Sequence, residues 1–81
     1  MSQIEKLLAS IRANPKDVRF DDACKVANAL GFTGKGGKGS HNSFSRAGEP
    51  IGLNFQSCSG KIPPYQARQL IDMIDKYEGE L

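Results

Sequence analysis

The spacing of the apolar residues changes twice along this chain of 81 residues. As far as Leu30 the apolar residues recur every three or four positions, which is the period of an amphipathic helix. From Pro50 to Gln56 they alternate with glycine or polar residues, which is the period of a half-buried strand. After Pro64 the helical spacing returns. The chain is therefore expected to fold into a domain of the α+β class.

Three helices are expected from the helical spacing. The first is expected over residues 2–12 and the second over residues 20–30, with Gly31 as its stop signal. Pro63 and Pro64 are expected to begin the third helix, because a proline in the first turn loses no hydrogen bond there. The apolar positions are Ile4, Leu7, Leu8 and Ile11, then Phe20, Cys24, Ala27 and Leu30, and finally Ala67, Leu70, Ile71, Ile74 and Tyr77. Each helix thus has one apolar face to bury.

Three strands are expected between the second and third helices. Phe32 and Thr33 begin the first strand, residues 39–46 form the second, and residues 50–56 form the third. The turn-forming residues at 46–50 predict a hairpin between the last two strands. The order of elements is then α-α-β-β-β-α. A small three-stranded antiparallel sheet with the helices packed on one face buries all the apolar stripes.

The length of the chain limits the kind of site it can carry. With 81 residues and no internal linker we expect a single domain over residues 1–81. A domain of this size buries only about 60% of its unfolded surface, so we expect a shallow site and no cofactor. The one histidine and two distant cysteines lack the spacing of a metal site. Cys24 is expected to be a small buried apolar residue, and Cys58 an incidental free thiol.

Neither a membrane span nor a targeting segment is expected from the sequence. No stretch of the chain is apolar over the roughly 20 residues that a membrane span requires. The first residues lack the pattern of a signal peptide. We therefore expect a cytoplasmic protein without a membrane partner.

The charges are unevenly distributed, although the net charge is only +2. Residues 31–68 carry five basic residues against Glu49 alone, and residues 69–81 carry four acidic residues against Lys76 alone. The five basic residues are Lys35, Lys38, Arg46, Lys61 and Arg68. A basic middle segment is the charge pattern expected of a nucleic-acid-binding surface, and a solvated basic loop is the alternative.

The only histidine lies at the end of a run of glycine and lysine residues at positions 34–41. Histidine titrates near neutral pH, so His41 beside Lys35 and Lys38 suggests proton transfer next to a phosphate. The run matches the dinucleotide-binding pattern G-x-G-x-x-G, but that motif follows a strand and opens a helix. Here a helix precedes and a strand follows. We therefore interpret the run as a backbone that approaches a sugar-phosphate closely, with a plain hairpin loop as the alternative.

Alternation along the second strand predicts where His41 points. If Phe44 points into the core, Asn42 and Arg46 point inward with it, and Arg46 must then lie at the end of the strand. The outward side chains are His41, Ser43 and Ser45. An outward histidine is exposed, as a reactive one must be.

Tyr65 follows the two prolines at the start of the third helix. The simpler interpretation is an aromatic residue of the core or of the helix start. Because it lies close in sequence to Lys61 and Arg68, the alternative is an aromatic ring that stacks on a base. Asn54 and Gln56 are expected to be exposed polar residues of the third strand.

Five sequence blocks follow one another in a distinctive order. They are Phe20-Asp21-Asp22-Ala23-Cys24-Lys25, Leu30-Gly31-Phe32, Lys38-Gly39-Ser40-His41 with Phe44, Leu53-Asn54-Phe55-Gln56, and residues 60–70 with the sequence GKIPPYQARQL. Together they resemble the HicA toxins of bacterial type II toxin-antitoxin systems. The resemblance covers about residues 15–78, and the helical extension at residues 2–12 lies outside it.

The resemblance implies a fold like that of a double-stranded-RNA-binding domain, ribosome-independent cleavage of mRNA, and neutralisation by a HicB-type antitoxin. His41 corresponds to the functional histidine of the family. Many members carry a histidine or a basic residue where this chain has Asn42. The RNA contacts that we expect come from Lys35, Lys38, Ser40, Arg46, Lys61 and Arg68.

Metal-independent cleavage of RNA requires a base for the 2′-hydroxyl and an acid for the leaving 5′-oxygen, and His41 can serve in either role. The second group is then water, Lys38, a hydroxyl of Ser40 or Ser43, or a residue of a second protomer. A non-catalytic double-stranded-RNA-binding module of the same fold is the first alternative function. A small subunit that only holds a protein partner is the second.

Overall fold

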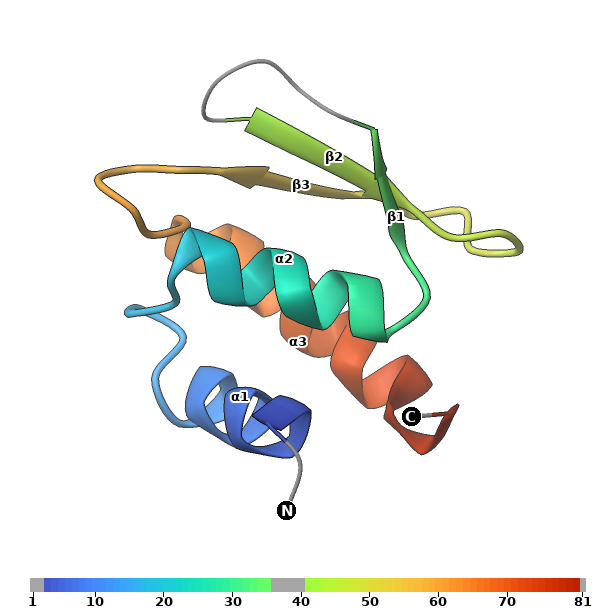
Figure 1. Cartoon of the computed structure of the whole chain (residues 1–81), viewed down its shortest axis with the longest axis horizontal. Coiled ribbons are helices and arrows are strands. Elements are labelled where there is room, and N and C mark those ends of the chain that lie inside the picture. The colour runs from blue at the N-terminus through green and yellow to red at the C-terminus, as the bar shows by residue number, and fades with distance from the viewer. Residues whose placement is uncertain (1–2, 36–40, 81) are drawn as a thin grey trace.

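A computed structural model describes residues 3–35 and 41–80 of the chain, and for Lys35 and His41 the backbone alone. Its elements are α1 (Gln3–Ala13), α2 (Phe20–Ala29), β1 (Thr33–Lys35), β2 (His41–Ser45), β3 (Leu53–Gln56), α3 (Pro64–Tyr77) and the 3₁₀ turn η1 (Glu78–Glu80). The predicted order α-α-β-β-β-α and the α+β class are confirmed (Figure 1). Positions 39 and 40 of the predicted second strand lie outside the described residues.

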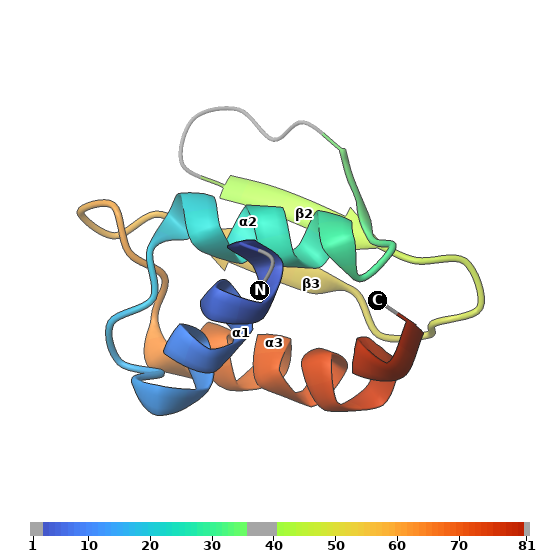
Figure 2. The same cartoon turned by 60° about the horizontal axis from the view of Figure 1, so that its bottom comes forward.

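The sheet is antiparallel with the strand order β1-β2-β3, so β2 is the central strand. All three helices lie on one side of it, as the sequence predicted (Figure 1, Figure 2). Helices α2 and α3 pack against the sheet, and α1 packs against α2 and α3 on their far side. No described helix covers the opposite face of the sheet. None of the described helices combines the length and the apolar character needed to cross a bilayer.

The hydrophobic core lies between the sheet and the helices α2 and α3. Its largest fully buried side chains are Phe32, Phe55, Leu53, Leu70, Ile74 and Val26. The rings of Phe44 and Phe55, on neighbouring strands, pack with their centroids 5.5 Å apart in a tilted arrangement. The strand residues that face the helices are thus buried in the core, and the polar residues that alternate with them form the open face of the sheet.

Gly34 has a packing role in the sheet. It lies opposite Phe44 in the pairing of β1 with β2. A Cβ atom at position 34 would approach Cε2 of Phe44 to 2.9 Å, which is closer than carbon atoms pack without displacement. The glycine therefore allows the Phe44 ring to lie against β1. One glycine of the glycine-lysine run is thereby explained by packing.

The third strand is shorter than predicted. It begins at Leu53 instead of Pro50, and Ile51, which the alternation placed in the core, is 54% exposed. The N–H of Ile51 donates to Oε2 of Glu49 at 3.0 Å, and the N–H of Glu49 donates to the carbonyl of Arg46 at 3.0 Å. These bonds belong to the turn, so the hairpin loop extends further than the apolar alternation indicated and the pairing with β2 starts only at Leu53.

Candidate nucleic-acid interface

His41 begins the central strand, and its backbone pairs with Gln56 at the end of β3. On the other side of β2 the described pairing ends at Lys35 opposite Ser43. At its His41 end, β2 therefore runs beyond the described part of β1. A neighbouring strand fixes the backbone of His41 on the β3 side, which holds the residue at one end of the sheet.

The predicted alternation along β2 is confirmed for the side chains that the structure describes. Phe44 is buried and Asn42 half-buried on the helix side, whereas Ser43 and Ser45 are exposed. The side chain of His41 lies outside the described residues, so its outward direction stays a prediction.

Asn42 is directed at α2. Its Nδ2 donates to Sγ of Cys24 at 3.7 Å. Cys24 is half-buried, not fully buried as expected, and its burial raises the pKa of the thiol, which favours the protonated form. Position 42 thus lies on the helix side of the sheet. A larger or charged residue there would have to displace the contact with Cys24.

The open face of the sheet carries small polar side chains. Those that the structure describes as exposed are Thr33, Ser43, Ser45 and Asn54, and we call them the open sheet face. Oγ of Ser43 donates to Oδ1 of Asn54 at 2.7 Å, and Oγ1 of Thr33 donates to the carbonyl of Ser45 at 3.4 Å. By strand register, Lys35, Ser43 and Asn54 form one row across the three strands. This surface offers hydroxyl and amide groups next to the backbone of His41.

Gln66 fixes the first turn of α3 against the end of β3. Its side chain is buried, and Oε1 accepts a hydrogen bond from the N–H of Gln56 at 2.8 Å. Because Gln56 pairs with His41, this bond places the N-terminus of α3 at the His41 end of the sheet. Figure 1 shows the first turns of α2 and α3 at that same end. Sequence reasoning missed Gln66, because a glutamine on a helix carries no signal of burial.

Tyr65 lies in the same turn, so its expected place at the helix start is confirmed, whereas its exposure shows that it is not a core aromatic. Its side chain is 57% exposed, and its hydroxyl accepts a hydrogen bond from Nε2 of Gln66 at 3.3 Å. Arg68, one helical turn further on, is also exposed. The structure therefore brings Tyr65, Arg68 and the backbone of His41 to one end of the molecule.

Arg46 belongs to a different part of the structure. It follows the last residue of β2, so it lies roughly 16 Å from His41 at a rise of about 3.3 Å per residue. Its guanidinium lies 3.7 Å from the centroid of the Tyr77 ring, and Nη2 lies 2.7 Å from Oε1 of Glu80. The inward direction and the position at the strand end were predicted. These contacts hold Arg46 to the C-terminal residues and away from the His41 end.

Lys61 lies near the start of α2. Its Nζ forms an ion pair with Asp17, and this pair lowers the pKa of the Asp17 carboxyl group. With Arg19, Asp21 and Gly60 it lines a hollow of about 280 Å³. Arg19 and Lys61 line it together with the carboxylate of Asp21, and Lys61 is already paired with Asp17. The remaining expected RNA contacts are not described: Lys38 and Ser40 lie outside the described residues, as does the side chain of Lys35.

A cluster at the far end of the sheet went unnoticed in the sequence. Glu49, in the hairpin loop, accepts hydrogen bonds from Nζ of Lys76 at 2.6 Å, from the hydroxyl of Tyr77 and from the N–H of Ile51. These three donors lower the pKa of Glu49 to about 2. With Arg46 on the Tyr77 ring, the cluster ties the hairpin to the end of α3; we call it the C-terminal clasp.

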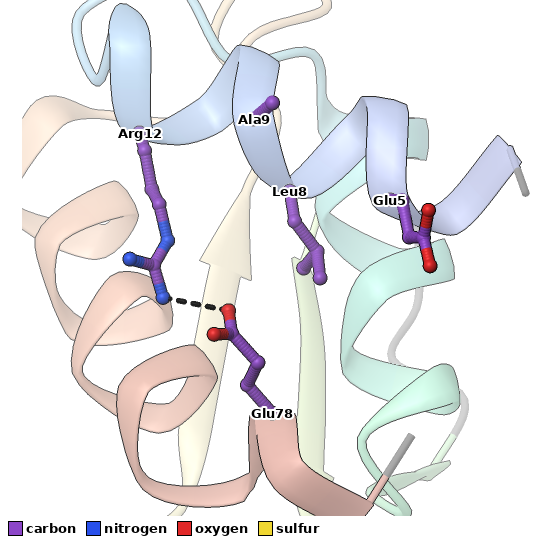
Figure 3. Close-up of a pocket in the computed structure, with 5 residues that line it drawn as sticks. All are labelled: Glu5, Leu8, Ala9, Arg12 and Glu78. Atoms are coloured by element: carbon purple, nitrogen blue, oxygen red, sulfur yellow. Dashed lines mark hydrogen bonds and ion pairs between the residues drawn. The ribbon is translucent and has the colours of Figure 1, made fainter. Parts of the chain in front are cut away.

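A second hollow lies between α1 and η1, on the side of the helices away from the sheet. It has a volume of about 440 Å³ and is lined by Glu5, Leu8, Ala9, Arg12 and Glu78. In Figure 3 the side chains of Arg12 and Glu78 meet across it, with Nη2 of Arg12 2.8 Å from Oε2 of Glu78. Arg12 also pairs with Asp75 at 2.6 Å. These contacts fasten α1 to the C-terminal end of the chain.

Within the described residues no group of three or more His, Cys, Asp and Glu side chains is placed to hold a metal ion. Comparisons of the chain with models of protein families, with characterised proteins and with solved structures gave no match. The candidate site is therefore defined by the geometry at the His41 end of the sheet.

Proposed function

We propose that the chain is an endoribonuclease toxin of the HicA type, that its substrate is mRNA and that His41 is its catalytic acid or base. The observation that carries the proposal is the place of His41, which begins the central strand beside the first turn of α3. The order α2-β1-β2-β3-α3, with both helices on one face, supports a fold like that of a double-stranded-RNA-binding domain. Arg68, which is exposed, and Lys35 and Lys38, which precede His41 in the sequence, supply charge that suits a phosphate backbone.

In the proposed reaction the 2′-oxygen of a ribose attacks the adjacent phosphorus, and the bond from phosphorus to the 5′-oxygen breaks. The products are a 2′,3′-cyclic phosphate and a 5′-hydroxyl group. His41 either takes the proton of the 2′-hydroxyl or gives a proton to the leaving oxygen, a role that contributes about 10²–10⁴-fold to the rate. Water, Lys38, Ser40, Ser43 or a residue of a second protomer fills the other role. Cationic groups stabilise the negative charge that develops on the phosphate.

The same proposal includes a protein partner, a HicB-type antitoxin in the cytoplasm that covers the His41 end of the sheet. A cover over this end would remove both the proton-transfer group and the basic surface from solvent. The partner would co-purify with the chain when a neighbouring gene encodes it. His41→Ala is expected to leave this association intact, because it removes no backbone contact of β2.

The test is induced expression of the wild type and of His41→Ala, followed by analysis of total RNA and growth. The matched control is Ser45→Ala, an exposed position four residues along the same strand. We expect cleaved mRNA and arrested growth for the wild type and for Ser45→Ala, and neither for His41→Ala. Purified wild type is expected to cleave RNA in the presence of a chelator.

The proposal is wrong if the purified wild type leaves RNA whole in the absence of an antitoxin, or if His41→Ala cleaves as fast as the wild type. A wild type that binds RNA without cleaving it, with His41→Ala binding equally well, would instead indicate the non-catalytic RNA-binding module.

A further inference from the structure

We propose that Tyr65 stacks on an unpaired nucleobase next to the phosphate on which His41 acts, so that the RNA enters the site single-stranded at that nucleotide. This inference rests on the proposed cleavage of RNA and names the form of its substrate. It assigns to Tyr65 a binding role at the His41 end of the sheet.

Tyr65 differs from the other aromatic residues of the chain. The six aromatic side chains all lie within the described ranges, and the four phenylalanines and Tyr77 are buried or half-buried. Tyr65 alone is exposed, with 57% of its surface accessible. A single exposed ring is common on protein surfaces and does not define a site by itself. Its place on the turn of α3 that bonds to Gln56, the strand partner of His41, is what carries the inference.

A chain of contacts holds Tyr65 at this position. Its hydroxyl is bonded to Nε2 of Gln66, and Oε1 of the same buried amide accepts the N–H of Gln56, which pairs with His41. The path from the Tyr65 hydroxyl to the His41 backbone thus consists of two hydrogen bonds, one amide group and one strand spacing of about 4.8 Å. A nucleotide and its neighbour can span such a path. A base on the Tyr65 ring therefore leaves an adjacent phosphate within reach of β2.

The chemistry around Tyr65 favours RNA over an apolar partner. Arg68 is exposed three residues further along the same helix, where residues share one face. Ser43 and Asn54, in the row next to the backbone of His41, carry a hydroxyl and an amide group, which suit ribose and phosphate oxygens. In a duplex both faces of each base are covered by its neighbours, so a ring can stack only on a base that is unpaired.

The experiment separates binding from cleavage by using the His41→Ala protein as the parent. Its affinity for a fluorescent, unstructured oligouridine is measured by anisotropy at low salt, alone and with Tyr65→Phe, Tyr65→Leu or Ile51→Ala added. Ile51 is the matched control, since it is 54% exposed and lies in the hairpin loop at the far end of the sheet. Circular dichroism verifies that each variant folds, which is expected because both side chains are exposed.

We expect Tyr65→Leu to weaken binding by about 5- to 100-fold, because base stacking on an aromatic ring is lost. Tyr65→Phe keeps the ring but loses the hydrogen bond to Gln66, so its affinity should lie between those of the parent and Tyr65→Leu. Ile51→Ala should bind like the parent. The chain has no tryptophan, so tyrosine fluorescence can be followed directly. Oligouridine should quench it in the parent and not in Tyr65→Phe, even though both bind. A duplex of matched length should show no dependence on Tyr65.

The stacking proposal is overturned if Tyr65→Leu binds oligouridine as tightly as the parent, or if the parent does not bind oligouridine. It is also overturned if Tyr65→Phe binds as weakly as Tyr65→Leu, because that result would indicate a role for the hydroxyl and not for the ring. An equal loss of duplex binding would also overturn it. The proposed cleavage is tested separately with the wild-type chain, which retains His41. If RNA binding depends on Tyr65 but the wild type does not cleave RNA, Tyr65 keeps its stacking role and His41 loses its catalytic role.

Discussion

The side-chain oxygen of Gln66 accepts a hydrogen bond from the backbone N–H of Gln56 at 2.8 Å, which joins the first turn of α3 to the end of β3. Both partners lie beside the strand that begins at His41. The contact therefore belongs to the core and to the candidate site at once. It explains why a polar side chain is buried at the start of an otherwise apolar helix face.

Replacing Gln66 with leucine should destabilise the fold. The volume is similar, but the N–H of Gln56 loses its acceptor, and an unsatisfied amide costs about 1–3 kcal/mol. Urea unfolding followed by circular dichroism measures the loss. Gln69→Leu, at an exposed position of the same helix, should stay within about 0.5 kcal/mol of the wild type. Equal stability of the two variants would show that the contact does not contribute.

The C-terminal clasp should make stability depend on acidic pH. The folded state lowers the pKa of Glu49 from 4.5 to about 2, so its contribution is complete above the unfolded value and is lost as the pH falls toward about 2. Glu49→Gln should flatten the decline of the urea midpoint in this window. Tyr77→Phe keeps the ring under Arg46 and removes one donor, so it should flatten the decline partly. An unchanged pH profile in Glu49→Gln would contradict the clasp.

Gly34→Ala should destabilise the sheet by about 1–3 kcal/mol, since the added methyl group collides with the ring of Phe44. Adding Phe44→Leu should recover part of this loss, because the smaller side chain leaves room. Gly79→Ala is the control, as a Cβ atom at position 79 would meet no other atom within 4 Å. Thermal unfolding compares the variants. A neutral Gly34→Ala would show that the Phe44 ring does not rest on β1.

Arg46 and Arg68 should separate stability from RNA binding. Arg46→Ala removes the contacts with Tyr77 and Glu80, so it should lower the thermal midpoint and leave RNA affinity unchanged. Arg68→Ala should leave the midpoint unchanged and weaken RNA binding, with the salt dependence of affinity reduced by about one ion. Melting curves and anisotropy at several salt concentrations decide this. If Arg46→Ala weakens RNA binding and Arg68→Ala does not, the RNA surface lies at the C-terminal clasp.

The sequence was sufficient to predict the order of helices and strands and to assign which side chains of β2 face the helices, because both follow from local periodicity. The alternation that placed Phe44 inward and Ser43 outward depends only on residues within one strand. Ile51 followed the same alternation and was placed wrongly, because a hydrogen bond to the Glu49 side chain extends the loop. Local spacing contains no information about such a contact.

Contacts between segments that are distant in the chain could not be predicted from the sequence. Arg46 meets Tyr77 and Glu80 only once the hairpin folds onto the end of α3. The charge count grouped Arg46 with the other basic residues of the middle segment, whereas the fold places it at the opposite end of the sheet from Lys61 and Arg68. The exposure of Tyr65 likewise depends on how α3 packs against the sheet, and the position of Tyr65 along the helix does not determine that packing.

The most direct test of the proposed catalysis is the single-turnover rate of RNA cleavage by the purified chain and by His41→Ala. We predict that His41→Ala lowers the rate by about 10²-fold or more, with unchanged circular dichroism and with 2′,3′-cyclic phosphate ends on the wild-type products. Ser45→Ala should cleave at the wild-type rate. Equal rates for the wild type and His41→Ala would contradict the central role of His41.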